Sequence, residues 1–272
     1  MDFSKLCSIA INAARSAGKI IQSFQNEDVV VELKVAGTSH ASQVVTLVDR
    51  ACEKEILSHL GPSCEEFDIA ILTEETDDDG SRFERDFFWC VDPIDGTLPF
   101  INREPGFSVS IALVAKDGTP YIGAVYDPSK DVMYHAIRNG GAFVDGQALV
   151  IRYTNEFLTY VTDRSLRDTA RAVEIGQILD ETAKNLRLNR VVELAGAGSV
   201  LNAIRVLENG PACMLKFPKE EEGGGSVWDF AATACIFHEL GLRATNYEGG
   251  QLDLNRQDGT FMNHEGVFYA NL

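Results

Sequence analysis

Residues 87–97, with the sequence FFWCVDPIDGT, constrain the fold of this chain more than any other stretch. The first five residues are apolar or nearly so, and such a short run predicts a buried strand rather than a helix. The character changes at Asp92, where we expect the strand to end, and Pro93 cannot donate to a sheet ladder. Asp95 and Gly96 form a turn signal. A buried strand that delivers two carboxylates into a tight turn is therefore the centre of the predicted fold.

These two carboxylates admit two interpretations. Asp92 and Asp95 lie three residues apart on the predicted turn and can converge on one point. Mg²⁺ is usually held by a few carboxylates together with water and substrate phosphate, and the N–H groups of Gly96 and Thr97 can face a phosphate if a short helix begins there. The alternative is an Asx-type turn, in which both side chains bond only to their own backbone. For the motif taken alone, that alternative is the better interpretation.

Other motifs favour the cation site over the Asx turn. Together with residues 92–97 they resemble the inositol monophosphatase superfamily of Mg²⁺-dependent, lithium-sensitive phosphomonoesterases. The 3′(2′),5′-bisphosphate nucleotidases are a branch of the same superfamily. The matching segments follow the family order and span most of the chain: they are Asp49, Glu74 with Glu75, residues 92–97, and residues 228–232 (WDFAA). The resemblance implies an α/β fold, the layered α-β-α-β-α sandwich of the sugar phosphatases. It also implies an N-terminal α+β half over residues 1–150 and a C-terminal α/β half over residues 151–272.

The resemblance further implies a cation site with two or three Mg²⁺ ions. One ion would be held by Glu74, Asp92 and the carbonyl of Ile94. A second would be held by Asp92, Asp95 and Asp229. Taken alone, Glu74 reads as a solvated loop acid and Asp229 as a helix N-cap, although a capping carboxylate still has oxygen to offer a cation.

The implied reaction is direct attack of an activated water on a phosphate monoester, without a phosphoenzyme. Thr97 and Asp49 would orient the water and take its proton. Glu74, a ligand of the first cation, would be the third catalytic residue. The N–H groups of Gly96 and Thr97 would hold the phosphate, and Asp95 would contact the substrate as well as the cation. Taken alone, Asp49 is better explained by the helix dipole, because it lies in the first turn of a predicted helix.

The substrate side of the site is less defined, and two alternatives stay open. Glu222 stands seven residues before Asp229, where inositol-specific members place a carboxylate that binds a sugar hydroxyl. Arg164 and Ser165 lie in a stretch that partly resembles the S-R-S-H of the bisphosphate nucleotidases, and Arg164 could bind a second phosphate bidentately. We rank an inositol-monophosphatase-type enzyme first, a nucleotidase acting on adenosine 3′,5′-bisphosphate second, and a non-catalytic binding protein on the same fold third.

The hydrophobic pattern predicts the remaining elements. Residues 27–40 indicate a strand followed by a loop, and a helix from residue 44 should stop at Gly61 and Pro62. The other predicted helices cover residues 6–24, with Asp2 as a candidate N-cap, and residues 168–185, 199–207 and 229–240. The other predicted strands cover residues 68–72, 108–115, 121–126, 132–138, 142–144, 160–162, 190–194 and 212–216.

Composition excludes several classes of function. A net charge of −17 over 272 residues argues against a nucleic-acid partner, which needs a basic face. An anionic substrate remains compatible with this charge if bound cations dominate the local field. No run approaches the ~18 apolar residues of a membrane span, and six scattered cysteines with no leader sequence indicate the cytoplasm. We therefore expect a small phosphorylated substrate, no membrane partner and, from the resemblance, a homodimer.

Overall fold

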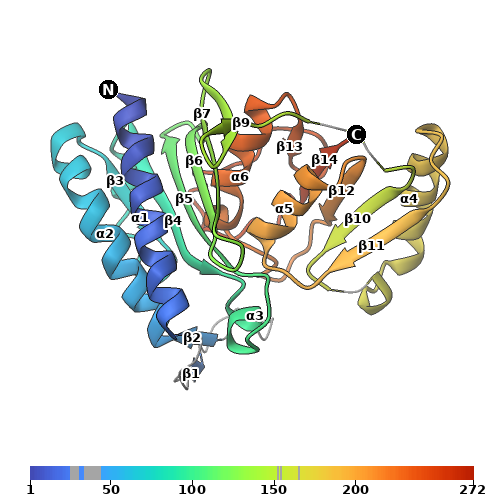
Figure 1. Cartoon of the computed structure of the whole chain (residues 1–272), viewed down its shortest axis with the longest axis horizontal. Coiled ribbons are helices and arrows are strands. Elements are labelled where there is room, and N and C mark those ends of the chain that lie inside the picture. The colour runs from blue at the N-terminus through green and yellow to red at the C-terminus, as the bar shows by residue number, and fades with distance from the viewer. Residues whose placement is uncertain (25–30, 34–43, 152, 154, 165) are drawn as a thin grey trace.

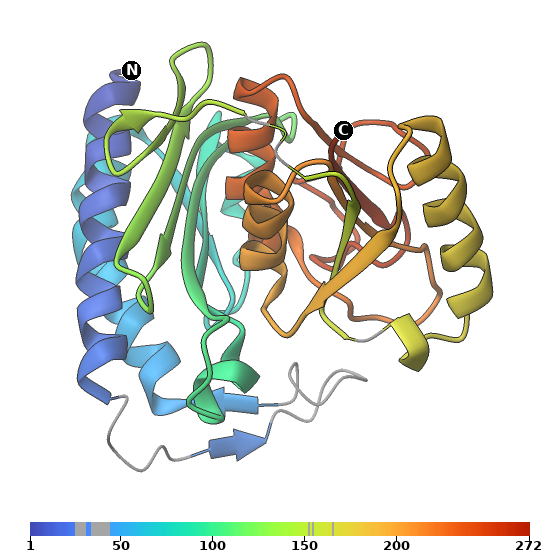
Figure 2. The same cartoon turned by 45° about the vertical axis from the view of Figure 1, so that its right-hand side comes forward.

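The structure is a computed structural model that describes residues 1–24, 31–33, 44–151, 153, 155–164 and 166–272. Helices and sheets alternate in layers across the molecule (Figure 1). An outer pair of helices covers a seven-stranded sheet, a second pair separates it from a five-stranded sheet, and one helix covers the far face (Figure 2). In that order the helices are α1 (Phe3–Phe24) and α2 (Leu47–Phe67), then α5 (Ser199–Glu208) and α6 (Val227–Glu239), then α4 (Ala172–Asn185). The predicted α-β-α-β-α sandwich is confirmed.

The seven-stranded sheet runs in chain order from β3 to β9. Its first pair is parallel and the following pairs are antiparallel. The turn signals at residues 117–118 and 139–140 join β5 to β6 and β7 to β8, as predicted. Both faces are covered by helices, so the central strands are buried almost throughout. The strands are β3 (Ala70–Thr73), β4 (Phe87–Asp95), β5 (Ser108–Ala115), β6 (Pro120–Asp127), β7 (Val132–Ile137), β8 (Gly141–Val144) and β9 (Gln147–Ala148).

The five-stranded sheet has the order β11-β10-β12-β14-β13. Strands β11 and β12 are both parallel to β10 and flank it, so three carboxyl ends lie at one edge of the sheet. Ligands of open α/β sheets bind at such an edge, where the strand order reverses. The strands are β10 (Leu158–Thr162), β11 (Val191–Ala195), β12 (Ala212–Lys216), β13 (Arg243–Thr245) and β14 (Val267–Asn271). The first sheet ends at Ala148 and the second begins at Leu158, while the division into two domains stays a prediction.

Two features of α2 differ from the prediction. Residues 44–46 form β2 (Val44–Thr46), which pairs with β1 (Val31–Leu33), and the helix begins only at Leu47. The helix also continues through Pro62, which was expected to stop it. The buried hydroxyl of Ser63 donates to the carbonyl of Leu60 at 2.6 Å and accepts the indole N–H of Trp89 at 3.0 Å, so tertiary contacts hold the last turn in place. The remainder of the strand and loop predicted over residues 27–40 lies outside the described residues.

Two other helix boundaries were wrong by a few residues. Helix α4 begins at Ala172, because residues 166–168 form a separate 3₁₀ turn. Helix α6 begins at Val227, two residues before the predicted start, and its N-cap is Ser226. In the part of the chain that the structure describes, no helix combines the length and apolar character needed to cross a membrane.

Candidate active site

A β-bulge places Asp92 and Asp95 on one face of the first sheet. Asp92 pairs with Ser110 of β5 and Asp95 pairs with Ser108, so three steps along β4 correspond to two along its neighbour. In a regular strand, residues three apart point to opposite faces, and the extra residue of the bulge restores a common face. The strand therefore continues to Asp95 and does not end at Asp92 as expected, because Pro93 lies within this irregular step.

The third carboxylate comes from the first turn of α6. Carboxylate oxygens of Asp92, Asp95 and Asp229 lie within 4.8 Å of one another. Asp229 is the third residue of the helix rather than its N-cap: the N–H of Ser226 donates to Asp229 Oδ2 at 2.6 Å, which completes a capping box. Ser110 Oγ also donates to the carbonyl of Trp228 at 3.1 Å, which ties this turn to the first sheet. Segments more than a hundred residues apart thus meet at one cluster.

Helix α5 contributes to the same cluster through its backbone. The N–H groups of Ser199 and Val200 donate to the two oxygens of Asp95 at 3.0 and 2.9 Å. A Cβ atom on Gly198 would lie 2.2 Å from the same carboxylate, so this position leaves no room for a side chain. The positive end of the helix dipole stabilises the negative charge of Asp95.

The electrostatics of the cluster suit a bound cation. Burial raises the pKa of Asp92 well above its usual range, and the charges of Glu74, Asp95 and Asp229 raise it further. Burial and the Asp229 charge raise the pKa of Asp95 in the same way. Asp92 Oδ1 is buried and has no hydrogen-bond partner among the described residues. A divalent cation would compensate this charge and satisfy the free oxygen.

The charges of Glu74 and Asp49 also raise the pKa of Asp92, so both carboxylates lie near this cluster. Asp49 is buried in the first turn of α2. The N–H of Glu74 donates to the carbonyl of Val91 at 3.2 Å, which extends the β3–β4 ladder by one residue. The hydroxyl of Thr73, the residue before Glu74, donates to the buried Glu53 at 2.8 Å.

The turn after β4 forms the short helix α3 (Thr97–Ile101). Gly96 precedes it with a φ of 84°, and a Cβ atom there would lie 2.4 Å from the carbonyl oxygen of Gly106. Thr97 Oγ1 donates to the carbonyl of Ile94 at 3.2 Å, so the threonine hydroxyl and this carbonyl oxygen lie together at the bulge. The roles assigned to Ile94, Gly96 and Thr97 stay predictions.

Comparison with known proteins agrees with this geometry. The sequence model of the inositol monophosphatase family matches residues 2–271. The chain belongs to the inositol monophosphatase family. Inositol monophosphatase 2 of Solanum lycopersicum is 31% identical over 252 residues, which cover 90% of this chain and 89% of that protein. Nus factor SuhB of Haemophilus influenzae is 37% identical over 251 residues, which cover 90% of this chain and 86% of that protein.

Solved structures show the same fold. The extragenic suppressor protein suhB from Bartonella henselae superposes with a TM-score of 0.72 at 22% identity, over 98% of this chain and 94% of that chain. Family membership supports phosphatase chemistry, and Asp92, Asp95 and Asp229 form an acidic cluster that could hold a cation.

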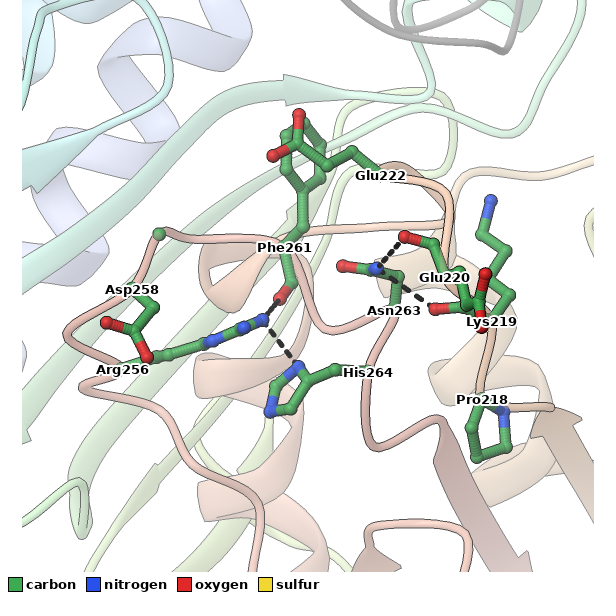
Figure 3. A pocket seen from close by; sticks show the side chains of 10 residues that line it. Pro218, Lys219, Glu220, Glu222, Arg256, Asp258, Phe261, Asn263 and His264 are labelled. Carbon is green, nitrogen blue, oxygen red and sulfur yellow. Dashed lines mark hydrogen bonds between the residues drawn. The ribbon is translucent and has the colours of Figure 1, made fainter.

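The predicted substrate residues are more dispersed than the carboxylates of the family motifs. Arg164 is exposed just beyond β10, and its N–H lies 3.4 Å from Thr162 Oγ1. Ser165 lies outside the described residues. Glu222 lines a separate cavity of about 480 Å³, whose lining includes none of the three clustered carboxylates (Figure 3). That cavity is lined by Pro218, Lys219, Glu220, Glu222, Arg256, Asp258, Gly259, Phe261, Asn263 and His264.

Lys216, the last residue of β12, lies beside the cluster and was not among the site residues predicted from the sequence. Its ammonium group lies 2.8 Å from Ser199 Oγ and 3.3 Å from Asp163 Oδ2. Its charge also lowers the pKa of Asp95 and Asp229 against the larger effect of burial. A charged residue at the end of a buried strand, at the edge where the three parallel strands end, was the available signal.

Proposed function

We propose that this chain is a Mg²⁺-dependent, lithium-sensitive phosphomonoesterase acting on a small phosphate monoester of the inositol monophosphate type. The observation that carries the proposal is the convergence of Asp92, Asp95 and Asp229 around a buried carboxylate oxygen without a hydrogen-bond partner among the described residues. A charged cluster of this kind costs stability unless something compensates it, and the donor set consists of the hard oxygens that Mg²⁺ prefers.

The cation ligands would be Glu74, Asp92 and the Ile94 carbonyl for one ion, and Asp92, Asp95 and Asp229 for the other. When bound, the cations would supply Lewis-acid chemistry: a lower pKa for water and compensation of charge on the leaving oxygen. Thr97 and Asp49 would orient the attacking water and accept its proton. The N–H groups of Gly96 and Thr97 would bind the phosphate oxygens.

The bisphosphate nucleotidase stays the second candidate. Arg164 favours it, because this guanidinium is exposed at the carboxyl end of β10, beside the edge where the three parallel strands end. Glu222 favours the inositol phosphate, on the condition that its loop folds over the substrate. A carboxylate facing a second phosphate would repel it, so the three glutamates at residues 220–222 weigh toward the monophosphate.

A non-catalytic protein on the same fold is the third candidate. One relative carries the name Nus factor, which describes a role other than phosphate hydrolysis for that protein. A chain that had lost catalysis would be free to lose its ligand carboxylates, whereas every predicted carboxylate is present in this one. We further propose a cytoplasmic homodimer without nucleic-acid or membrane partners.

A phosphate-release screen with Mg²⁺ tests the proposal. The substrates are monophosphorylated polyols, fructose 1,6-bisphosphate and 3′-phosphonucleotides. We expect the polyol monophosphates to be hydrolysed with the highest kcat/KM. Preference for the 3′-phosphonucleotides would establish the second candidate, and no release from any substrate would favour the third.

A further inference from the structure

Lys216 joins three segments that surround the carboxylate cluster. Its side chain is only 17% exposed. The ammonium group donates to Ser199 Oγ at 2.8 Å, to the carbonyl of Gly224 at 2.8 Å and to Asp163 Oδ2 at 3.3 Å. An ammonium group has three N–H donors, so these contacts occupy all of them. Lys216 therefore acts as a cross-link within the protein and has no donor left for a substrate.

Two of the three segments hold a predicted cation ligand through their backbone. Ser199 accepts a hydrogen bond from Lys216 with its hydroxyl and donates its own N–H to Asp95 at 3.0 Å. Gly224 lies two residues before Ser226, whose N–H donates to Asp229 at 2.6 Å. A movement of the Lys216 ammonium would thus be transmitted to both carboxylates.

The segment before α6 needs such a cross-link. Gly223, Gly224 and Gly225 all have left-handed φ angles, of 113°, 84° and 113°. Consecutive glycines lose more conformational entropy on folding than other residues, so external contacts must fix their conformation. The contacts that do so are the hydrogen bond from Lys216 to Gly224 and the hydrogen bond from the N–H of Met262 to the carbonyl of Gly225 at 3.0 Å.

We propose that Lys216 is a positioning residue for the divalent-cation site: by fixing the α5 N-terminus and the glycine segment, it orients Asp95 and Asp229. The inference rests on the proposed function, since it concerns the same cation site. It also makes a prediction of definite sign. A positive charge close to the site repels a divalent cation, so a purely electrostatic role would make Mg²⁺ bind more tightly when Lys216 is replaced. A positioning role makes Mg²⁺ bind more weakly.

The test is a calorimetric titration of the full chain with Mg²⁺ in the absence of substrate. In Lys216→Met the unbranched apolar stem is largely kept, but the charge and all three donors are lost. We expect about tenfold weaker Mg²⁺ binding, as for other residues that orient metal ligands. Lys216→Arg keeps the charge and several donors and should restore most of the affinity. In turnover assays the rate of Lys216→Met should recover at high Mg²⁺, with the KM for substrate unchanged.

Two further variants complete the design. Lys184→Met removes an exposed lysine of α4, and its Mg²⁺ affinity should equal that of the wild type. Ser199→Ala removes one of the three contacts but keeps the N–H that binds Asp95, so it should weaken Mg²⁺ binding less than Lys216→Met does. It keeps the test decisive if Lys216→Met does not fold. Unchanged or tighter Mg²⁺ binding in Lys216→Met, or in Ser199→Ala where Lys216→Met does not fold, would overturn the inference alone. A wild type that binds no Mg²⁺ would overturn the proposed function together with the inference.

Discussion

The backbone N–H of Ser199 donates a hydrogen bond to Oδ1 of Asp95 at 3.0 Å, although 104 positions separate the two residues. Asp95 lies at the end of β4 in the first sheet, and Ser199 opens α5, between the two sheets. The cation site is therefore built across the boundary between the two sheets, and its geometry depends on how the N-terminus of α5 approaches the bulge in β4.

This close approach predicts the effect of a methyl group at Gly198. The added Cβ would lie 2.2 Å from Asp95 Oδ2, and the φ of −62° imposes no backbone strain on alanine. Gly198→Ala should displace the carboxylate and lower kcat on the order of 10²-fold, as expected for the loss of one strong electrostatic element. Gly176→Ala on α4 is the control, because its added Cβ meets nothing within 4 Å. Equal activity of both variants in a phosphate-release assay would contradict the proposed packing.

Removal of single ligand charges should slow turnover without unfolding the chain. Asp95→Asn and Asp229→Asn keep the side-chain shape and each remove one negative charge from the cluster. We expect losses in kcat on the order of 10²-fold or more for each variant. Circular dichroism should show an unchanged fold. If either variant kept nearly the wild-type rate at ordinary Mg²⁺, the substituted residue would not be a ligand.

Stability should depend on pH and Mg²⁺ together. Burial raises the pKa of Asp92 and Asp95 in the cation-free protein, so the folded state holds these protons more tightly than the unfolded chain. The extra stability from these bound protons is fully present below the unfolded pKa of about 3.9. It is lost as the pH rises through the raised pKa values of the folded state. The melting temperature without cations should therefore fall over that range. The melting temperature of Asp92→Asn should fall less over the same range, because this variant lacks one of the two titrating carboxyl groups.

Mg²⁺ binds the ionised carboxylates and must displace their protons. The rise in melting temperature caused by Mg²⁺ should thus increase with pH in the wild type and be smaller in Asp92→Asn. Differential scanning calorimetry across the acidic and neutral range measures both quantities. A Mg²⁺ effect that is independent of pH would show that these carboxylates are not the binding groups.

Substrate choice should separate the roles of Arg164 and Glu222. If Arg164 binds a second phosphate, Arg164→Ala should weaken binding of the bisphosphate nucleotide by about 1.5–3 kcal/mol, the range for a charge-assisted hydrogen bond. If Glu222 binds a sugar hydroxyl, Glu222→Gln should lower kcat/KM for inositol phosphate and leave nucleotides almost unchanged. We expect the second outcome, and Glu221→Gln at the exposed neighbouring position is the matched control. A strong nucleotide preference that disappears in Arg164→Ala would reverse this order.

Local patterns were sufficient to predict much of the fold. The strands Ser108–Ala115 and Ala212–Lys216 have the bounds that their apolar runs predict. Boundaries failed where tertiary contacts override a local signal. Pro62 remains helical because Ser63 is held by Trp89, and no sequence window contains that contact.

The candidate site was predictable only in part. The motif around Asp92 and Asp95 indicated two convergent carboxylates, but the bulge that orients them arises from pairing with β5 and is not visible in β4 alone. Lys216 was missed because its partners Ser199 and Asp163 are distant in sequence and charged residues after strands are common. Glu222 matched a family spacing, yet it lines a cavity apart from the carboxylate cluster, since a glycine segment separates it from Asp229.

The most direct test of the central claim is phosphate release from inositol monophosphate by the full chain, measured with Mg²⁺, with excess chelator, and with Mg²⁺ plus Li⁺. We predict turnover that requires Mg²⁺, stops in chelator and is inhibited by Li⁺, which could replace a cation at Asp92, Asp95 and Asp229 and stall product release. Full turnover in excess chelator would contradict the account.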